Sequence, residues 1–233
     1  MVTVKVLVAC EESQRVCIEL RKLGHEAFSC DILPCSGGHP EWHIQDDVLK
    51  HLNDGWDLMI AHPPCTYLSR AGARWLHQKG TINQERYVKG LEAKDFFLKL
   101  LSANIPKIAI ENPTPLKIYL LPKHTQVIQP YMFGHKFSKK TLLWLKNLPE
   151  LKATDLIEDY SPFLPSNTGG KKRGQKFKIK NVVRDQKEAS KTFQGIAQAM
   201  SKQWTMEVKS GCDANDDGIP PNNKLLGILP NEL

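Results

Sequence analysis

The stretch Trp56–Gly72, which reads WDLMIAHPPCTYLSRAG, decides the predicted fold. Its apolar residues up to Ala61 predict a buried strand, and the two prolines that follow end this strand because proline lacks a backbone donor. Cys65 therefore lies just beyond the carboxyl end of the strand. In open α/β sheets, ligands bind at this edge, so Cys65 is a candidate functional residue.

Strand and helix patterns alternate on both sides of this stretch. The predicted strands are 4–10, 26–31, 44–48, 57–61, 107–110, 125–129 and 141–145, and the predicted helices are 13–23, 83–102 and 189–204. In the helix 83–102, the apolar spacing predicts that Val88 and Leu91 face inward. Gly24 is placed to end the first helix. This alternation predicts an α/β fold with a mostly parallel sheet and helices on both faces.

Length and composition indicate one domain of ordinary size. The chain has 233 residues, 41% of them hydrophobic, and no apolar run approaches the roughly 20 residues that span a bilayer. We divide it into a core (1–146), a short basic region (147–187), a helix that returns to the core (188–209) and a loose tail (210–233). The first residues suggest a strand and not a signal peptide, which predicts a cytoplasmic protein with reduced cysteines.

The charge distribution favours an acidic partner. The formal net charge is +7, and residues 170–191 hold nine Lys or Arg against two acids. Lys171, Lys172 and Arg173 stand near the start of this segment, beside glycines that give it flexibility. A solvated loop is the plain alternative, but the charge density favours contact with the phosphates of a nucleic acid.

Three side chains with reactive or charged groups follow predicted strands. Asp31 ends the second strand, Cys65 follows the fourth and Glu111 follows the fifth. Because the carboxyl ends of parallel strands meet at one edge of the sheet, we expect a cysteine and a carboxylate to face one pocket. This combination is typical of covalent catalysis.

Two motifs carry a resemblance to a known family. The stretch PPCTYLSRAG, at Pro63–Gly72, resembles the catalytic motif of DNA cytosine-5 methyltransferases, in which Pro-Cys precedes a polar residue, a hydrophobic residue, Ser, a variable residue, Ala and Gly. The tripeptide ENP at Glu111–Pro113 resembles the Glu-Asn motif of that family, about 45 residues downstream. The resemblance implies a Rossmann-like, class I methyltransferase fold dependent on S-adenosylmethionine.

The resemblance also implies a mechanism. Cytosine C5 is a poor nucleophile, and attack of a thiolate on C6 turns the ring into an enamine that accepts a methyl group. By this resemblance Cys65 is the nucleophile, Glu111 is the partner of cytosine N3, and Ser69 belongs to the loop that closes over the base. The base leaves the duplex to reach them.

An S-adenosylmethionine site along the sheet edge is implied as well. Asp31 is similar to the acid that holds the ribose hydroxyls, and Asp47 to the acid near the adenine amino group. The turn after the first strand reads ACEES and departs from the family by lacking glycine. Lys191 stands where the final motif of the family carries an asparagine. Its positive charge would suit an anionic variant of the cofactor, carboxy-S-adenosylmethionine. The expected cofactor contacts are Ala9, Cys10, Glu11, Ser13, Asp31, Ile32, Asp47, Pro63 and Lys191.

The resemblance further implies how DNA is held. The segment Ser138–Trp144 is similar to a basic motif that contacts the flipped base and its backbone, with lysines where arginines are usual. Only the short region 147–187 separates this basic motif from the final motif of the family, which predicts short or relaxed sequence specificity. Such a small recognition region is typical of a compact phage enzyme, which would act in the host cytoplasm. The expected DNA contacts are Ser69, Arg70, Lys139, Lys140, Lys171, Lys172 and Arg173.

Other functions remain open on the sequence alone. An exocyclic amino methyltransferase carries an acid or Asn, two prolines and an aromatic residue at this strand end, and the chain lacks that aromatic residue. A DNA-binding protein with a degenerate methyltransferase fold fits the absence of glycine after the first strand.

The sequence gives only weak support for a metal site. Cys30, Cys35, His39 and His43 offer zinc ligands at a spacing near the usual finger patterns. The tail holds half of a calcium loop, but Lys224 stands where a bidentate Glu is required. We therefore predict no metal.

Overall fold

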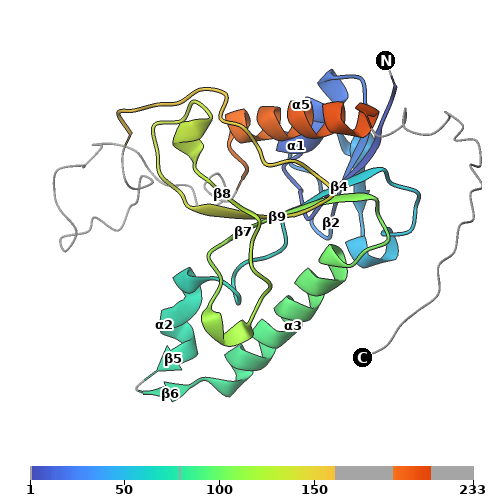
Figure 1. The fold of residues 1–233 in the computed structure, drawn as a ribbon. Helices are drawn as coiled ribbons and strands as arrows, with labels where there is room; N and C mark the ends of the chain where they lie inside the picture. Colours follow the sequence, from blue (N-terminus) through green and yellow to red (C-terminus); the bar gives the residue numbers. More distant parts are fainter. Residues whose placement is uncertain (1, 79, 161–190, 211–233) are drawn as a thin grey trace, which may run out of the picture.

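The computed structural model describes residues 2–78, 80–160 and 191–210, and its centre is a seven-stranded mixed sheet (Figure 1). The strand order is β3-β2-β1-β4-β7-β9-β8. Their bounds are β1 Lys5–Ala9, β2 Glu26–Asp31, β3 His43–Gln45, β4 Leu58–Ala61, β7 Lys107–Pro113, β8 Gln126–Ile128 and β9 Thr141–Lys146. The predicted α/β fold with a mostly parallel sheet is confirmed.

The direction of the strands changes toward one edge of the sheet. Strands β3, β2, β1, β4 and β7 run parallel, whereas β9 pairs antiparallel with both β7 and β8. From β1 the chain first builds outward to β2 and β3, and then crosses back to place β4 and β7 on the other side. The carboxyl ends of β1 and β4 therefore form a topological switch point, where open α/β sheets bind ligands.

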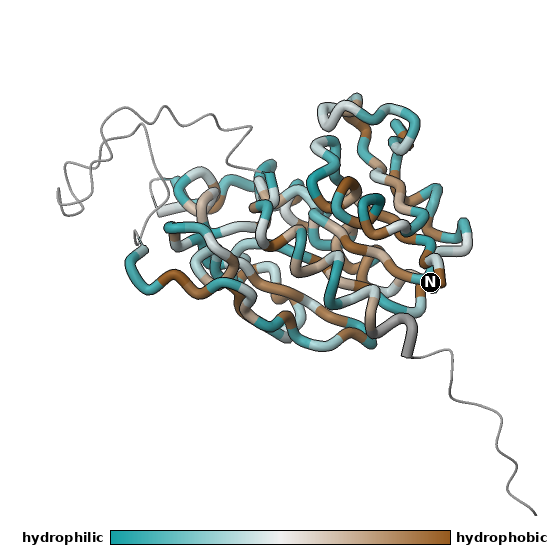
Figure 2. The backbone as a smooth tube through the Cα atoms, turned by 90° about the horizontal axis from the view of Figure 1, so that it is seen from above, coloured by the Kyte–Doolittle hydropathy of each residue, from teal (hydrophilic) through white to brown (hydrophobic). Residues whose placement is uncertain are grey.

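Helices cover both faces of the sheet (Figure 1). Helices α1 (Arg15–Lys22) and α5 (Gln194–Ser210) lie together on one face, and α3 (Gln84–Leu101) lies on the other. Successive strand residues point to opposite faces, so Val6 and Val8 pack toward α1 and α5, while Leu7 packs toward α3. Figure 2 shows apolar residues concentrated along the central strands.

The inward side of α3 differs from the expectation. Val88 is 50% exposed and Leu91 is 40% exposed, whereas Phe97 and Leu100 are buried. The first half of α3 reaches past the sheet and packs against Tyr119 through Gly90, where a Cβ would lie 2.1 Å from the tyrosine ring. Apolar spacing predicted the helix correctly, but it could not predict how much of the helix packs against the sheet.

Several element ends also differ from the expectations. Strand β7 continues to Pro113 because β9 pairs with it as far as Thr141. Strand β3 is shorter than predicted and ends at Gln45, and α5 begins at Gln194 and not at Ala189. Gly24 ends α1 as predicted, with a φ of 81°. Three short elements were not predicted: α2 (Ala73–Leu76), β5 (His77–Gln78) and β6 (Thr81–Ile82).

Parts of the predicted organisation lie outside the described residues. These are most of the basic region, with Lys171, Lys172 and Arg173, and the tail beyond Ser210. Across the described residues, none of the helices combines the length and the apolar character that a membrane span needs.

Candidate active site

Strand register brings the two candidate catalytic side chains to adjacent strands. Ala61, the last residue of β4, pairs with Ile110 of β7, so the next residues along the two strands are His62 and Glu111. Cys65 follows three residues later, after the two prolines that end β4. The cysteine and the carboxylate predicted to share one edge of the sheet therefore come from neighbouring strands at the switch point.

The loop after Cys65 is fixed onto the segment that follows Glu111. The N–H of Ser69 donates to the carbonyl oxygen of Cys65 at 2.9 Å, and the N–H of Arg70 donates to the carbonyl oxygen of Thr114 at 3.0 Å. Ser69 is only 3% exposed, and its hydroxyl interacts with the Cys65 thiol and not with solvent. These contacts hold Cys65 close to the Glu111 strand.

Asn112 is a residue whose role the sequence did not assign. Its side-chain amide donates to the carbonyl oxygen of Pro63 at 3.1 Å, and the residue is 1% exposed. Its buried Oδ1 has no hydrogen-bond partner within the part of the chain that the structure describes. Asn112 thus ties the Pro-Pro-Cys turn to β7, which explains physically why an Asn follows Glu111.

The surroundings of Cys65 keep its thiol protonated near neutral pH. Burial is the main cause that raises the pKa of Cys65 above 9.0, and the charge of Glu111 raises it further. Lys139 and the hydroxyl of Ser69 act in the opposite direction. Because Lys139 also lowers the pKa of Glu111, these side chains share one electrostatic environment.

His62 and Glu111 form a hydrogen-bonded ion pair. Nδ1 of His62 lies 2.9 Å from Oε2 of Glu111, and the two side chains are 13% and 17% exposed. Burial opposes the charge of His62, but Glu111 outweighs it and the pKa of His62 lies above 6.5. Burial likewise opposes the charge of Glu111, but His62 holds the pKa of this carboxyl below 4.5. The pair therefore keeps one proton beside the candidate nucleophile.

Replacing His62 with glutamine should destabilise the fold in a pH-dependent way. The depressed pKa of Glu111 contributes stability above pH 4.5 that is lost as the pH falls through its folded value, below 4.5. The raised pKa of His62 contributes stability below pH 6.5 that is lost as the pH rises through its folded value, above 6.5. We expect a loss of about 3 kcal/mol, largest between these limits.

Urea unfolding of both proteins across this range measures the difference directly. The same substitution made in a Glu111→Gln background serves as the control, and there the difference should vary little with pH. A His62→Gln effect that is flat from acid to alkaline pH would mean that the pair does not share a proton.

In the turn after β1, Cys10 takes the left-handed backbone conformation that a glycine would usually take. Cys10 has a φ of 59°, a conformation usually taken by glycine. Burial, followed by the charge of Asp31, raises the pKa of its thiol. The carboxylate of Glu11 caps α1 by accepting the N–H groups of Val16 at 2.8 Å and Cys17 at 3.2 Å. Glu11 therefore stabilises the helix start that the turn leads into.

The residues expected to meet a nucleoside lie at the ends of β2 and beyond β3. Asp31 is partly exposed and accepts the N–H of Leu33 at 2.9 Å, and Ile32 beside it is 73% exposed. Burial raises the pKa of Asp31. Asp47 is exposed and accepts the N–H of Leu49 at 3.0 Å. A carboxylate and an apolar side chain therefore stand next to each other at the sheet edge.

Other predicted contacts are spread more widely. Ser13 and Lys191 line one cavity of about 330 Å³ beside α1. Lys139 is partly exposed near Cys65, with its amine 5.7 Å from the ring of Phe193, and Lys140 is exposed. Arg70 is exposed on the Cys65 loop, while Ala9 and Pro63 are buried. Ser13 and Lys191 thus share a cavity whose lining does not include Asp31.

The four candidate zinc ligands have separate partners. Within the described residues, no three His, Cys, Asp or Glu side chains are grouped so that they could hold a metal ion. The thiol of Cys30 faces the carbonyl oxygen of Asp46, the ring of His39 stacks on Trp42 at 3.9 Å, and His43 Nδ1 lies 2.8 Å from Ser29 Oγ.

Gln14 is a second residue that sequence reasoning missed. It is fully buried, and its amide donates to the carbonyl oxygen of His39 at 2.8 Å and accepts the N–H of the same residue at 3.1 Å. It also accepts the thiol of Cys35 at 3.0 Å. A Cβ on Gly37 would lie 2.5 Å from the Gln14 Cβ, so the loop can close over this side chain only with a glycine there.

We expect Gln14→Ala to destabilise the protein by roughly 3 kcal/mol, because it leaves the partly buried backbone groups of His39 and the thiol of Cys35 without the Gln14 partner. Ser36→Ala in the same loop is the matched control, since its exposed hydroxyl donates to the exposed side of the loop, to Glu12 at 3.3 Å. Thermal unfolding of the two variants compares them. Similar small shifts in both would show that the loop does not depend on Gln14.

Comparisons with known proteins add no family to this geometry. No protein-family model matches the chain, and no curated protein sequence matches it significantly.

Proposed function

We propose that the protein is a DNA cytosine-5 methyltransferase of the class I, Rossmann-like type that acts through a covalent Cys65 adduct. The observation that carries this proposal is the shared environment of Cys65 and Glu111, which two adjacent parallel strands bring to the switch point of the sheet. A nucleophile and a carboxylate that shares a proton with His62, at one edge of the sheet, are the pair that addition to a pyrimidine ring requires.

Each residue has a distinct part in the proposed reaction. The thiol of Cys65 gives up its proton to solvent and its sulfur forms a bond to C6 of cytosine, while Glu111 passes to N3 the proton that it shares with His62. C5 then accepts the methyl group and loses its proton, and the electron pair of that C–H bond expels Cys65 as thiolate. His62, at 2.9 Å from Glu111, holds the proton that the N3 contact uses.

We assign the S-adenosylmethionine site to three residues at the sheet edge whose side chains are exposed or partly exposed. When bound, this cofactor supplies the methyl group. The partly exposed carboxylate of Asp31 suits the ribose hydroxyls, the exposed side chain of Ile32 suits the apolar face of an adenine ring, and Asp47 suits the adenine amino group. Lys191, beside Ser13, would favour an added carboxylate if the cofactor is carboxy-S-adenosylmethionine.

DNA is the proposed substrate, with the target base turned out of the helix. Lys139 provides positive charge beside Cys65 and Glu111, and Arg70 and Lys140 are exposed for phosphate contact. Lysines bind phosphate as point charges, so they position the strand more than they read its sequence.

An oligonucleotide that contains 5-fluorocytosine tests the proposal. Fluorine replaces the C5 proton, so elimination cannot follow methyl transfer and the covalent adduct accumulates. We expect a complex that survives denaturing electrophoresis, depends on S-adenosylmethionine and maps to Cys65 by mass spectrometry. No adduct with either form of the cofactor, in duplex or single strand, would overturn the proposal.

A further inference from the structure

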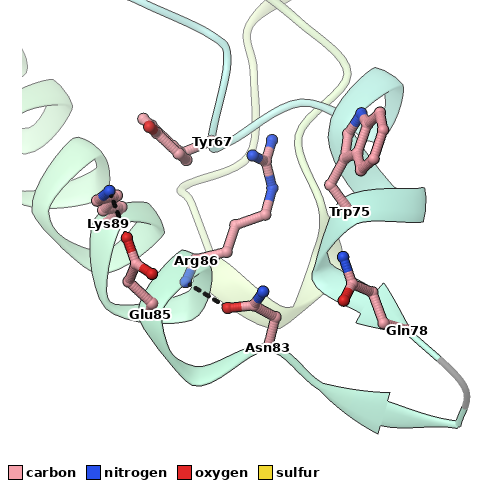
Figure 3. A pocket seen from close by; sticks show the side chains of 7 residues that line it. All are labelled: Tyr67, Trp75, Gln78, Asn83, Glu85, Arg86 and Lys89. Atoms are coloured by element: carbon pink, nitrogen blue, oxygen red, sulfur yellow. Dashed lines mark hydrogen bonds and ion pairs between the residues drawn. The ribbon is translucent and has the colours of Figure 1, made fainter.

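A second cavity lies beside the Cys65 loop. Its volume is about 380 Å³, and it lies between the loop after Cys65, the short α2–β5 segment and the first turns of α3 (Figure 3). It is lined by Tyr67, Trp75, Gln78, Asn83, Glu85, Arg86 and Lys89. The proposed reaction uses none of these side chains.

The lining combines aromatic rings with cations. Figure 3 shows the Arg86 side chain rising from α3 between Tyr67 and Trp75. The Arg86 guanidinium lies 4.9 Å from the centre of the Tyr67 ring, and Arg74 lies 4.8 Å from that of Trp75. Trp75 is 51% exposed, while the other four tryptophans of the chain are partly or fully buried. An exposed indole ring next to arginines can stack on a planar ring such as a nucleic-acid base.

Two cations in the cavity can meet a phosphate. Arg86 uses one N–H for the carbonyl oxygen of Thr66 at 2.7 Å, and its guanidinium has further donors. Lys89 pairs with Glu85 at 2.7 Å, with side chains 44% and 78% exposed. Such an exposed pair is weak, so a phosphate can take the place of the carboxylate.

We propose that this cavity binds one unstacked nucleotide of the DNA strand that carries the target cytosine, with its base on Trp75 and its phosphate on Arg86 and Lys89. The amides of Gln78 and Asn83 stand where they can reach the edge of the base. The inference rests on the proposed function in taking DNA as the substrate. It adds that a neighbour of the target base must also leave the stack.

Occupation of the cavity would act directly on the nucleophile. Arg86 holds the carbonyl oxygen of Thr66, the residue next to Cys65, and a Cβ on Gly72 would lie 2.6 Å from the Arg86 guanidinium. A nucleotide bound on Arg86 therefore stabilises the loop that carries Cys65. The result is a strand held on both sides of the reacting base.

Fluorescence anisotropy with a labelled single-stranded oligonucleotide tests the inference on the full chain without cofactor. We expect Trp75→Ala to weaken binding about tenfold and Trp75→Phe to restore most of it, because phenylalanine keeps a ring to stack on. Trp75 is half exposed, so its replacement should leave the fold intact. Binding by Trp75→Ala within about twofold of the unaltered protein would overturn the inference.

Two lysines of α3 give a matched pair of variants. Lys89 and Lys99 are both exposed, and each pairs with a carboxylate one turn earlier, at 2.7 and 2.8 Å. Lys89 lines the cavity and Lys99 does not. We expect Lys89→Ala alone to weaken oligonucleotide binding, and equal effects of both variants would contradict the inference.

The two proposals can fail separately. If Trp75→Ala weakens oligonucleotide binding but the unaltered protein forms no 5-fluorocytosine adduct, the nucleotide site is supported and the methyl-transfer reaction is rejected. An adduct at Cys65 that forms equally well in Trp75→Ala, with unchanged binding, would retain the reaction and reject the site.

Discussion

Replacing Cys65 with serine should lower methyl transfer to DNA by at least about 10⁴-fold. A serine hydroxyl in the same place is far less ionised than a thiol, so little nucleophile is present to add to C6. The adduct with 5-fluorocytosine should disappear together with the activity. Incorporation of a labelled methyl group into DNA, at saturating S-adenosylmethionine, measures the change.

Cys35→Ser is the matched control for this variant. Cys35 is also partly exposed, and its thiol donates to Gln14 at 3.0 Å, a bond that a serine hydroxyl can replace. We expect Cys35→Ser to keep nearly full activity. Substantial methylation by Cys65→Ser would reject the covalent mechanism and favour transfer to an exocyclic amino group, which needs no thiol.

The raised pKa of Cys65 bears on when its thiol loses its proton. Burial and the charge of Glu111 raise the pKa of this cysteine above 9.0, so without DNA little thiolate is present near neutral pH. A phosphate bound to Lys139 would raise this pKa further, because Lys139 lowers it, so in the proposed reaction the thiol loses its proton only as its sulfur adds to C6.

The sequence was sufficient for the parallel half of the sheet. Buried parallel strands are short apolar runs, and those before Cys10, Cys65 and Glu111 could be recognised without knowledge of their partners. The antiparallel pairing of β9 with β7 could not be foreseen, because the direction of a strand depends on where the chain returns. That pairing extends β7 through Pro113 and thereby places Glu111 inside a strand.

The candidate site was predictable to the extent that it depends on strand ends. Cys65 follows β4 and Glu111 lies on β7, and because these strands are neighbours the two residues come to the same edge of the sheet. The ion pair of His62 with Glu111 was missed, although the strand register implies it once β4 and β7 are known to pair. Gln14 could not be found, since a buried amide that organises a distant loop leaves no local pattern in the sequence.

Glu111→Gln should lower the turnover number by about 10³-fold while the affinity for DNA changes little. Glutamine keeps the size of the side chain and can accept a hydrogen bond from His62, but it cannot give a proton to cytosine N3. Because the N3 contact strengthens only as the thiolate adds to C6, the loss falls on the transition state and not on binding. Single-turnover methylation and DNA binding, measured on the same preparation, separate the two effects. Glu12→Gln, at the same edge of the sheet, should retain activity, and a Glu111→Gln enzyme with near-normal turnover would show that N3 is assisted by another group.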